Sequence, residues 1–561
     1  MNEMALQLRS EPHPVSGAVY EEQGDGTVRV TDKAKGKSGL FQWTGEYLEG
    51  DLTQADLHFL RFIGGPTLPA EKDIFWTMLP VAGLGERIQT NLPPSRGGAD
   101  AKEGKTAQRP KIIAPYVGDA GKDTPQGKRA SSSVPQEYFS ENDRRRDLLP
   151  EVYTRSNPYP GGPKRVPVAR FFEQKYHDLE VEHIWKKVWQ MACREDDIPD
   201  VGDYVLYKIA HLEFIVVRTG EAEFKAYPNA CLHRGRRLCN HDGKKAALFR
   251  CPYHGWSWNV DGSIKEITCE WDFPGVREEV AHLPEARTAA WGGFVFINPD
   301  PDCMSFEDYA GPEMLEHYRK FKLENRYKQA HVGRVIRANW KLMLEAFTEA
   351  YHSIATHPQL LLSGGDLTDT RYDVFGNWSR LGHLNASGSS PLRGIIASPE
   401  QSLEMFRGMA DFNKSYLRSL IGDEVEEYSD AELVEQTFNN LFPNFSPWGG
   451  WARIVYRFRP NGTNPEECIM EAMLLAPWPK DQPKPPAAQL RMLGPDEPWV
   501  TAEELGTLAR IFDQDCGNVP DTHEGLKSKQ PPYVIYSAYQ ESIIRAFHDR
   551  YEQRLGLAEG E

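Results

Sequence analysis

Two short segments of the sequence each offer one cysteine and one histidine, Cys231-Leu-His233 and Cys251-Pro-Tyr-His254. Such a set can bind zinc, or a two-iron cluster in which histidines replace the thiolates on one iron. Zinc fingers usually pair Cys with Cys and His with His along the chain. Here each segment supplies one of each, which favours a binuclear cluster held between two hairpin tips. Cys231 and Cys251 would bind the buried iron. His233 and His254 would bind the outer iron.

A second group of metal-binding side chains follows in the segment NWKLMLEAFTEAYHSIATHPQ. A helix over residues 339–352 would place Glu345, Glu349 and His352 on one face, because they are spaced by four and three residues. His357 does not follow that period, since five residues turn an ideal helix roughly 140° past the starting position. Both histidines can meet one metal only if the helix widens or ends nearby, and the proline after His357 favours an end there.

The sequence resembles a known family at both places. CLHRG followed by CPYHGWSWNVDG resembles the Rieske domain of ring-hydroxylating oxygenase large subunits, and NWK with E-x-x-x-E-x-Y-H-x-x-x-x-H resembles the mononuclear iron segment of the same family. The chain is identified as a member of the Rieske non-haem iron oxygenases, of the large (alpha) subunit type, with an atypical amino-terminal extension. Gly235 and Gly255 would let the two loops approach the cluster sulfurs closely. Cys239 is expected to be a buried free thiol.

The resemblance implies one Rieske [2Fe-2S] cluster and one mononuclear Fe(II). It also implies that a late aspartate is the third ligand of the mononuclear iron, and Asp515 in IFDQDCGN occupies the matching position. Asp513 and Asp521 are its rivals. With His352 and His357, Asp515 would complete a facial triad of two histidines and one carboxylate, which leaves positions on the iron open for dioxygen.

Glu349 stands just before the first of these histidines. In the family an acid at this place connects the mononuclear site to the Rieske histidine of the next subunit in a head-to-tail trimer. Many ring-hydroxylating members carry Asp here, whereas some monooxygenase branches share Glu. The alternative is a solvated carboxylate on an exposed helix face. The resemblance therefore implies that Glu349 is catalytic but leaves the reaction subclass open.

By the same resemblance the chain is a terminal oxygenase component that hydroxylates a hydrophobic substrate, aromatic or polycyclic, with dioxygen. Electrons from NADH or NADPH would arrive through a separate reductase, with or without a ferredoxin, because the chain shows no flavin or nicotinamide fingerprint. A homotrimer or an α3β3 hexamer is implied. Alternatives are a Rieske monooxygenase such as an O- or N-demethylase, a Rieske electron-transfer protein, which needs only the first site, and a zinc-dependent binding module, which needs no iron.

Composition narrows the class of protein. The chain has 561 residues, 40% of them hydrophobic, and a formal net charge of −16. An acidic chain argues against a nucleic-acid partner, because phosphate binding calls for a basic face. Its apolar runs fall short of the ~18 residues of a membrane span, and its start lacks the pattern of a signal peptide. Its 8 cysteines are scattered. We therefore expect a cytoplasmic protein without a membrane partner and with reduced or metal-bound thiols.

The expected fold class is α+β, with a small all-β Rieske domain before a larger helix-grip (START-like) catalytic domain built on an antiparallel sheet. The expected domains are an extension over 1–165, a helical lead-in over 166–199, the Rieske domain over 200–303 and the catalytic domain over 304–561. Within the extension, residues 1–90 should form a small hairpin element that packs as an arm on a neighbouring subunit, and residues 91–165 should be a partly disordered linker or arm.

Local patterns predict further elements. Helices are expected over 171–191, 314–321 and 539–555, and strands at DYVLYKI, LEFIVVR and WARIVYRFR. Asn461-Gly462 is a strong turn signal, although about eight residues separate the expected flanking strands, which excludes a two-residue hairpin. The segment 360–414, with Phe375, Trp378, Leu381 and Leu384, and LFPNFSPWGG from 441 are expected to border the substrate pocket. A helix near 400–416 would shorten that long loop.

Overall fold

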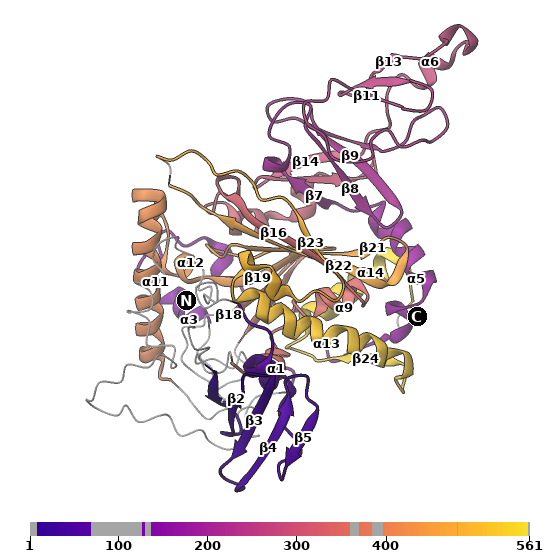
Figure 1. Ribbon diagram of the computed structural model, residues 1–561. Helices are drawn as coiled ribbons and strands as arrows, with labels where there is room; N and C mark the ends of the chain where they lie inside the picture. Colours follow the sequence, from indigo (N-terminus) through magenta and orange to yellow (C-terminus); the bar gives the residue numbers. More distant parts are fainter. Residues whose placement is uncertain are drawn as a thin grey trace, which may run out of the picture.

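The computed structural model describes residues 8–68, 126–128, 136–359, 370–383, 397–479 and 481–558. Figure 1 shows a central sheet with helices around it, a β-rich region that projects from one side, and a small amino-terminal sheet on the opposite side. The α+β class is confirmed. No helix in the described part of the chain is long and apolar enough to cross a bilayer.

The amino-terminal sheet is an antiparallel meander in the order β1 to β5. Its strands are β1 Ser10–Pro12, β2 Val19–Glu22, β3 Thr27–Asp32, β4 Lys37–Gln42 and β5 Tyr47–Gly50. Alternation along β3 buries Val28 and Val30 against Phe59 of helix α1 (Leu57–Gly64). Asp56 caps that helix by accepting a hydrogen bond from the Phe59 amide at 2.8 Å. The expected hairpin is therefore part of a small domain with its own core.

Helix α1 of the extension lies against helix α13 (Leu508–Ser528) of the same chain. Packing of the extension on a neighbouring subunit stays a prediction. Residues 91–125 and 129–135 of the expected linker lie outside the described residues. Residues 136–165 form α3 (Gln136–Glu141), α4 (Glu151–Thr154) and the start of β6 (Lys164–Pro167). They are ordered by contacts with the catalytic domain: Arg144 pairs with Asp430 at 2.7 Å, and β6 pairs with β24 (Tyr533–Tyr536).

The Rieske region contains three small antiparallel sheets. They are β8 Tyr204–Ile209 with β9 Leu212–Arg218 and β10 Phe224–Pro228; β11 Leu248–Arg250 with β12 Ser257–Asn259 and β13 Ile264–Glu266; and β14 Arg287–Trp291 with β15 Phe294–Asn298 and β7 Gln190–Arg194. Short turns η3 (Glu195–Asp197) and η4 (Glu270–Asp272) and helix α6 (Val276–Glu279) complete it. The expected strands DYVLYKI and LEFIVVR are confirmed as β8 and β9.

The helix expected over 171–191 is shorter. It consists of η1 (Val168–Phe171), α5 (Gln174–Glu180) and a π turn, η2 (Val181–Trp185), in which the Lys186 amide bonds back five residues to the Val181 carbonyl at 3.0 Å. From residue 190 the chain is a strand, because β7 pairs with β15. Pairing with a distant strand overrode the helical pattern.

The catalytic domain is built on an eight-stranded sheet in the order β17-β18-β19-β20-β21-β22-β16-β23. The strands are β16 Tyr327–Ile336, β17 Arg371–Phe375, β18 Trp378–His383, β19 Gln436–Leu441, β20 Phe445–Pro447, β21 Ile454–Asn461, β22 Asn464–Ala476 and β23 Arg491–Leu493. All neighbours are antiparallel except the short β23, which runs parallel to β16. Excluding a two-residue hairpin was wrong: Asn461 pairs directly with Asn464, and Gly462 takes a φ of 60°.

Helices cover this sheet (Figure 1). The helical elements of the domain are α7 Phe306–Ala310, α8 Pro312–Tyr318, η5 Leu323–Asn325, α9 Trp340–Glu345, α10 Ser353–Thr356, α11 Pro399–Ile421, η8 Gly422–Glu427, α12 Asp430–Val434, η9 Trp499–Thr501, η10 Glu503–Leu505, α13 and α14 Ser542–Leu555. The expected helices near 314–321, 400–416 and 539–555 correspond to α8, α11 and α14. Residues 360–369 and 384–396 of the expected pocket border, Leu384 among them, lie outside the described residues.

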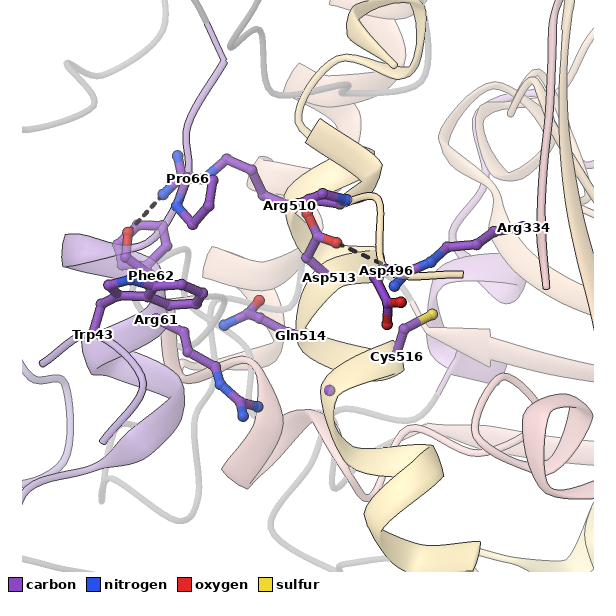
Figure 2. Close-up of a pocket in the computed structure, with 12 residues that line it drawn as sticks. Trp43, Arg61, Phe62, Pro66, Arg334, Asp496, Arg510, Asp513, Gln514 and Cys516 are labelled. Carbon is purple, nitrogen blue, oxygen red and sulfur yellow. Dashed lines mark hydrogen bonds and ion pairs between the residues drawn. The ribbon is translucent and has the colours of Figure 1, made fainter. Parts of the chain in front are cut away.

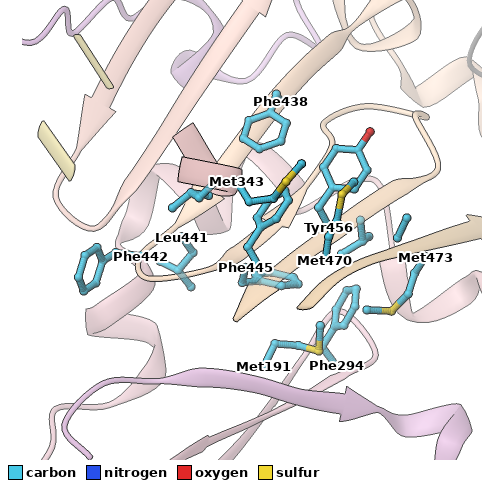
Figure 3. Close-up of a cluster of buried hydrophobic side chains, with 14 of the residues drawn as sticks. Met191, Phe294, Met343, Phe438, Leu441, Phe442, Phe445, Tyr456, Met470 and Met473 are labelled. Carbon is cyan, nitrogen blue, oxygen red and sulfur yellow. The ribbon is translucent and has the colours of Figure 1, made fainter. Parts of the chain in front are cut away.

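The Rieske and catalytic regions share one hydrophobic core (Figure 3). Phe294 of β15 packs against Phe445 of β20 with ring centroids 4.9 Å apart, and Met191 of β7 lies in the same cluster as Met473 of β22. Phe375 and Trp378, expected at the pocket, are buried in this core and stack on each other with centroids 5.5 Å apart. The shared core fixes the β14-β15-β7 sheet against the catalytic sheet, whereas Cys231 and Cys251 lie in a separate cluster of buried residues.

Candidate metal centres

The two cluster loops have the same backbone geometry. In each, the cysteine amide donates to the carbonyl five residues on, at 2.9 Å for Cys231 and 2.8 Å for Cys251. The amide of the glycine four residues after each cysteine donates back to the cysteine carbonyl, at 2.9 Å for Gly235 and 3.0 Å for Gly255. Both glycines have positive φ, 75° and 84°, a conformation that side chains disfavour. The local fold thus presents the side chains of both loops in the same way.

The loops bring the four predicted donors together as two pairs. The thiols of Cys231 and Cys251 are buried and close enough to hydrogen-bond each other. Burial raises the pKa of Cys231, whereas the amides of His233 and Arg234, which donate to its sulfur, lower it. The rings of His233 and His254 meet with centroids 4.7 Å apart, and Nδ1 of His233 is buried without a hydrogen-bond partner in the described part of the chain. An orphaned buried nitrogen suits a metal ligand.

This arrangement fits a binuclear cluster better than a single zinc ion. The four donors do not gather around one point, as a tetrahedral zinc site requires, whereas such a convergence is found elsewhere in the described residues. Trp256 stacks on His233 with centroids 4.7 Å apart and holds the ring in place. Cys239 is buried and free, and its thiol hydrogen-bonds with Tyr204, in line with the expected free thiol.

The second predicted group converges on one point. One ligand atom each of His352, His357 and Asp515 lies within 4.8 Å of the other two. Nε2 of His357 is 2.8 Å and Nε2 of His352 is 3.6 Å from Oδ1 of Asp515. That oxygen is buried and makes no hydrogen bond within the described residues. Two imidazole nitrogens and an orphaned carboxylate oxygen that face one point fit a two-histidine-one-carboxylate iron site.

The far nitrogen of each imidazole is held by a partner. Glu349 accepts from the amide of His352 at 2.8 Å and lies 2.6 Å from its Nδ1. Nδ1 of His357 lies 2.9 Å from Oε1 of Gln514. Burial opposes the charge of His352, but Glu349 and Asp515 together raise its pKa to about 9. Such outer partners orient the ring of a metal-ligating histidine and raise its basicity.

The helix expected over 339–352 is broken. Helix α9 ends at Glu345, because the amides of Phe347 and Thr348 bond back only three residues. His352 is therefore the N-cap of a second short helix, α10, and His357 is its C-cap. This break solves the geometric problem that five residues of continuous helix would have posed for the two histidines.

The break also separates Glu345 from the metal centre. Its buried carboxyl group lies 2.7 Å from the Tyr536 hydroxyl and 2.8 Å from Nε2 of His548, and burial raises its pKa to about 8. The rivals of Asp515 point elsewhere. Asp513 accepts from the amides of Trp499 and Val500, and Asp521 is exposed.

Two residues near the triad were missed by the sequence reasoning. Gln514 stands between two aspartates and carries no spacing signal that marks it as a partner of His357. His58 lies in the amino-terminal extension, far away in sequence, yet its carbonyl accepts a hydrogen bond from Gln514. Burial lowers the pKa of His58, and the charges of His357 and Asp515 act on it. No local pattern could have found a contact across that separation.

Comparison with known proteins agrees with this geometry. Residues 188–277 match the Rieske [2Fe-2S] domain, and residues 312–557 match the catalytic domain of the ring hydroxylating alpha subunit. The chain belongs to the Rieske non-haem iron oxygenases. Both matches lie outside the amino-terminal sheet.

Individual relatives cover part of the chain. The oxygenase subunit of glycine betaine monooxygenase from Pseudomonas aeruginosa is 32% identical over 37% of this chain and 48% of its own length. The alpha subunit of biphenyl 2,3-dioxygenase from Rhodococcus jostii is 30% identical over 35% of this chain and 44% of its own length. The aligned part thus spans about half of these relatives. The structure of a naphthalene 1,2-dioxygenase mutant bound to phenanthrene superimposes with a TM-score of 0.51 at 20% identity, covering 71% of this chain and 93% of that one, and supports the fold.

Proposed function

We propose that this chain is the terminal oxygenase component of a multicomponent system that oxidises an organic substrate with dioxygen. The observation that carries the proposal is the convergence of two imidazole nitrogens and one carboxylate oxygen on one point, since an electron carrier needs only the cluster loops. One [2Fe-2S] cluster would be held by Cys231, His233, Cys251 and His254. One Fe(II) would be held by His352, His357 and Asp515.

When bound, an iron with three protein ligands supplies open positions for dioxygen and the oxidising power of the reaction. The chain supplies orientation. Glu349 and Gln514 hold the two imidazoles so that Nε2 of each faces Asp515. Asp515 and His357 are almost fully buried, which keeps water away from one side of the centre.

Electron supply in this proposal crosses between subunits. One cluster loop follows β11, which lies toward the outer end of the projecting region, whereas α13, which carries Asp515, lies on the other side of the central sheet (Figure 1). Within one chain the two centres are thus far apart. Glu349, in contact with His352, would receive a Rieske histidine of the neighbouring subunit in a head-to-tail trimer. A separate reductase, with or without a ferredoxin, would pass electrons from NADH or NADPH.

Aromatic side chains lie near the proposed iron site. Phe347, which lies between α9 and His352, packs against Tyr456 with centroids 5.0 Å apart and against Phe512 of α13 at 6.1 Å. The charge of Asp515 acts on Tyr456, whose pKa burial raises well above its usual value. An aromatic wall suits the hydrophobic, aromatic or polycyclic substrate of a dioxygenase.

A second candidate is monooxygenation of a quaternary ammonium compound. Two observations favour it: the glycine betaine relative, and Glu349 in place of the aspartate common in ring-hydroxylating members. The same aromatic side chains, beside the carboxylates of Glu349 and Asp515, would also hold an ammonium cation, by cation–π attraction and by charge.

Metal analysis separates the oxygenase from its alternatives. The oxygenase should contain about three irons and two acid-labile sulfides per chain. Two irons alone would leave an electron carrier, and zinc without sulfide would leave a binding module. Incubating the reconstituted system under labelled dioxygen with aromatic, steroid, methoxylated and quaternary ammonium compounds then identifies the reaction. Two labelled atoms in the product indicate a dioxygenase, and one indicates a monooxygenase.

Glu349 can be tested by exchange for glutamine. Glu349→Gln keeps the size of the side chain but removes the charge beside His352, so electron arrival at the mononuclear iron should slow in a single turnover. Unchanged single-turnover kinetics would remove Glu349 from the electron route.

A further inference from the structure

The amino-terminal domain docks on the helix that carries Asp515. Figure 2 shows the seam, with Trp43, Arg61 and Phe62 on one side and Arg510, Gln514 and Cys516 of α13 on the other. A cavity of about 230 Å³ remains within it. This domain lies outside both family matches, so nothing in the family pattern accounts for its place beside the metal centre.

Two contacts clamp α1 to α13. The carbonyl of Phe62 accepts from Arg510 at 2.8 Å, and the guanidinium group of Arg510 lies 4.6 Å from the centre of the Phe62 ring. The guanidinium group of Arg61 lies over Gly517, where a Cβ atom would come within 2.5 Å of Nη1. A glycine at this point of α13 thus makes room for the side chain from α1.

Gln514 of α13 connects helix α1 to His357, a proposed metal ligand. Its Oε1 lies 2.9 Å from Nδ1 of His357 and accepts from Gln359 at 2.6 Å. Its Nε2 donates to Oε1 of Gln359 at 3.2 Å and to the carbonyl of His58 in α1 at 3.5 Å. Because the amide nitrogen faces two acceptors, the amide oxygen must face the ring of His357. Gln514 is almost fully buried, so water does not readily replace a lost partner.

We propose that the amino-terminal domain is a built-in cap of the mononuclear iron site, and that α1, acting through Gln514, is a positioning element for His357. The inference rests on the proposed iron site. When α1 is docked, the His58 carbonyl holds the Gln514 amide in the orientation that accepts from Nδ1 of His357, and Nε2 is then left to face the metal. When α1 is lifted, this carbonyl is lost and the Gln514 amide gains freedom to turn.

Position 517 offers a matched test of docking. Gly517→Leu places a side chain where Arg61 lies, whereas Gly525→Leu makes the same exchange in the same helix where an added Cβ meets nothing within 4 Å. Full-length, cluster-loaded protein is compared by hydrogen exchange of the α1 amides, by Fe(II) affinity from chelator competition, and by the electron paramagnetic resonance spectrum of the ferrous site with nitric oxide. Gly517→Leu should speed hydrogen exchange of the α1 amides and weaken Fe(II) binding about 10-fold. This is the lower end of the loss expected when a residue that hydrogen-bonds a metal ligand is disturbed. Gly525→Leu should match the wild type.

Gln514→Leu tests whether Gln514 positions His357, and an about 10- to 100-fold loss of Fe(II) affinity is expected. Gln514→Glu retains the acceptor for Nδ1 of His357 and should recover part of the lost affinity. The proposal is overturned if Gly517→Leu frees α1 but leaves Fe(II) affinity and the nitric oxide spectrum unchanged. It is equally overturned if neither Gly517→Leu nor Arg510→Gln alters α1 exchange, since the seam would then not depend on these contacts. A wild-type protein that binds no Fe(II) would instead refute the proposed function.

Discussion

Replacing Asp515 and Asp513 by alanine, one at a time, should separate metal binding from stability. The two carboxylates stand two residues apart on α13, where Asp515 is buried and Asp513 is half-buried. Oδ1 of Asp515 makes no hydrogen bond within the described residues and faces two imidazoles. Asp513 accepts from the amides of Trp499 and Val500 at 2.8 and 3.2 Å. One carboxylate is placed to bind a metal, and the other to hold a turn.

The magnitudes follow from these contacts. Loss of a metal ligand should weaken Fe(II) binding more than the roughly 10- to 100-fold expected on loss of a residue that only hydrogen-bonds a ligand. Asp515→Ala should therefore weaken Fe(II) binding by more than about 100-fold, or about 2.7 kcal/mol. Asp513→Ala leaves two amides without an acceptor, at about 1–3 kcal/mol each. Burial raises the pKa of Asp513, so removing that carboxyl group recovers part of the cost. A net loss of about 2–3 kcal/mol in the free energy of unfolding is expected.

Fe(II) affinity is measured by anaerobic chelator competition, and stability by denaturant titration of the mononuclear-iron-free protein. The visible spectrum of the cluster serves as the internal control of folding. Asp515→Ala should bind little iron yet lose under about 1 kcal/mol of stability and keep its cluster spectrum. If Asp513→Ala loses iron while Asp515→Ala retains it, the assignment of the triad is wrong. Catalytic turnover by Asp515→Ala would lead to the same conclusion.

Three further outcomes are expected. Burial raises the pKa of Glu345 from 4.5 to about 8, so the folded state holds a proton that the unfolded state releases. The contribution of Glu345 to the free energy of unfolding is therefore full below pH 4.5 and falls by at most about 5 kcal/mol as the pH rises to 8. Glu345→Gln should flatten that decline when denaturation curves are measured across this pH range. Gly255→Ala should lose more cluster absorbance than Gly235→Ala, because only at Gly255 does an added Cβ meet a neighbour, Thr268 at 2.8 Å. A ferrous chelator should remove the mononuclear iron before the cluster, since the side chain of His352 is 25% exposed whereas both cysteines are buried, and added Fe(II) should restore it.

Local pattern was sufficient for the cluster loops. Each loop carries its own Cys, His and Gly within five residues, and its hydrogen bonds also close within six residues. The nearby strands β8 and β9 follow from short-range patterns of apolar residues. The fold class and family were therefore accessible from the sequence, because the features that define them are local.

Elsewhere long-range contacts overrode the local pattern. The expected helix over 339–352 ends at Glu345, whose carboxyl group is bound by Tyr536 and His548 from the end of the chain. The helix expected over 171–191 yields to strand β7, which pairs with β15. Helix α1 of the extension packs on α13 of its own chain, a contact that no local pattern indicated. In each case the deciding partner lies more than a hundred residues away.

The sequence by itself determined the kinds of metal centre and most of the donors proposed for them, because residue type and short spacing set which metal a loop can accept. Only the family resemblance favoured Asp515 over its rivals Asp513 and Asp521, because the three aspartates differ little in local context. Only the tertiary structure turned one carboxylate toward two imidazoles and another toward two backbone amides. The structure also brought the extension to Gln514, since burial and hydrogen bonding between distant segments depend on how the whole chain packs.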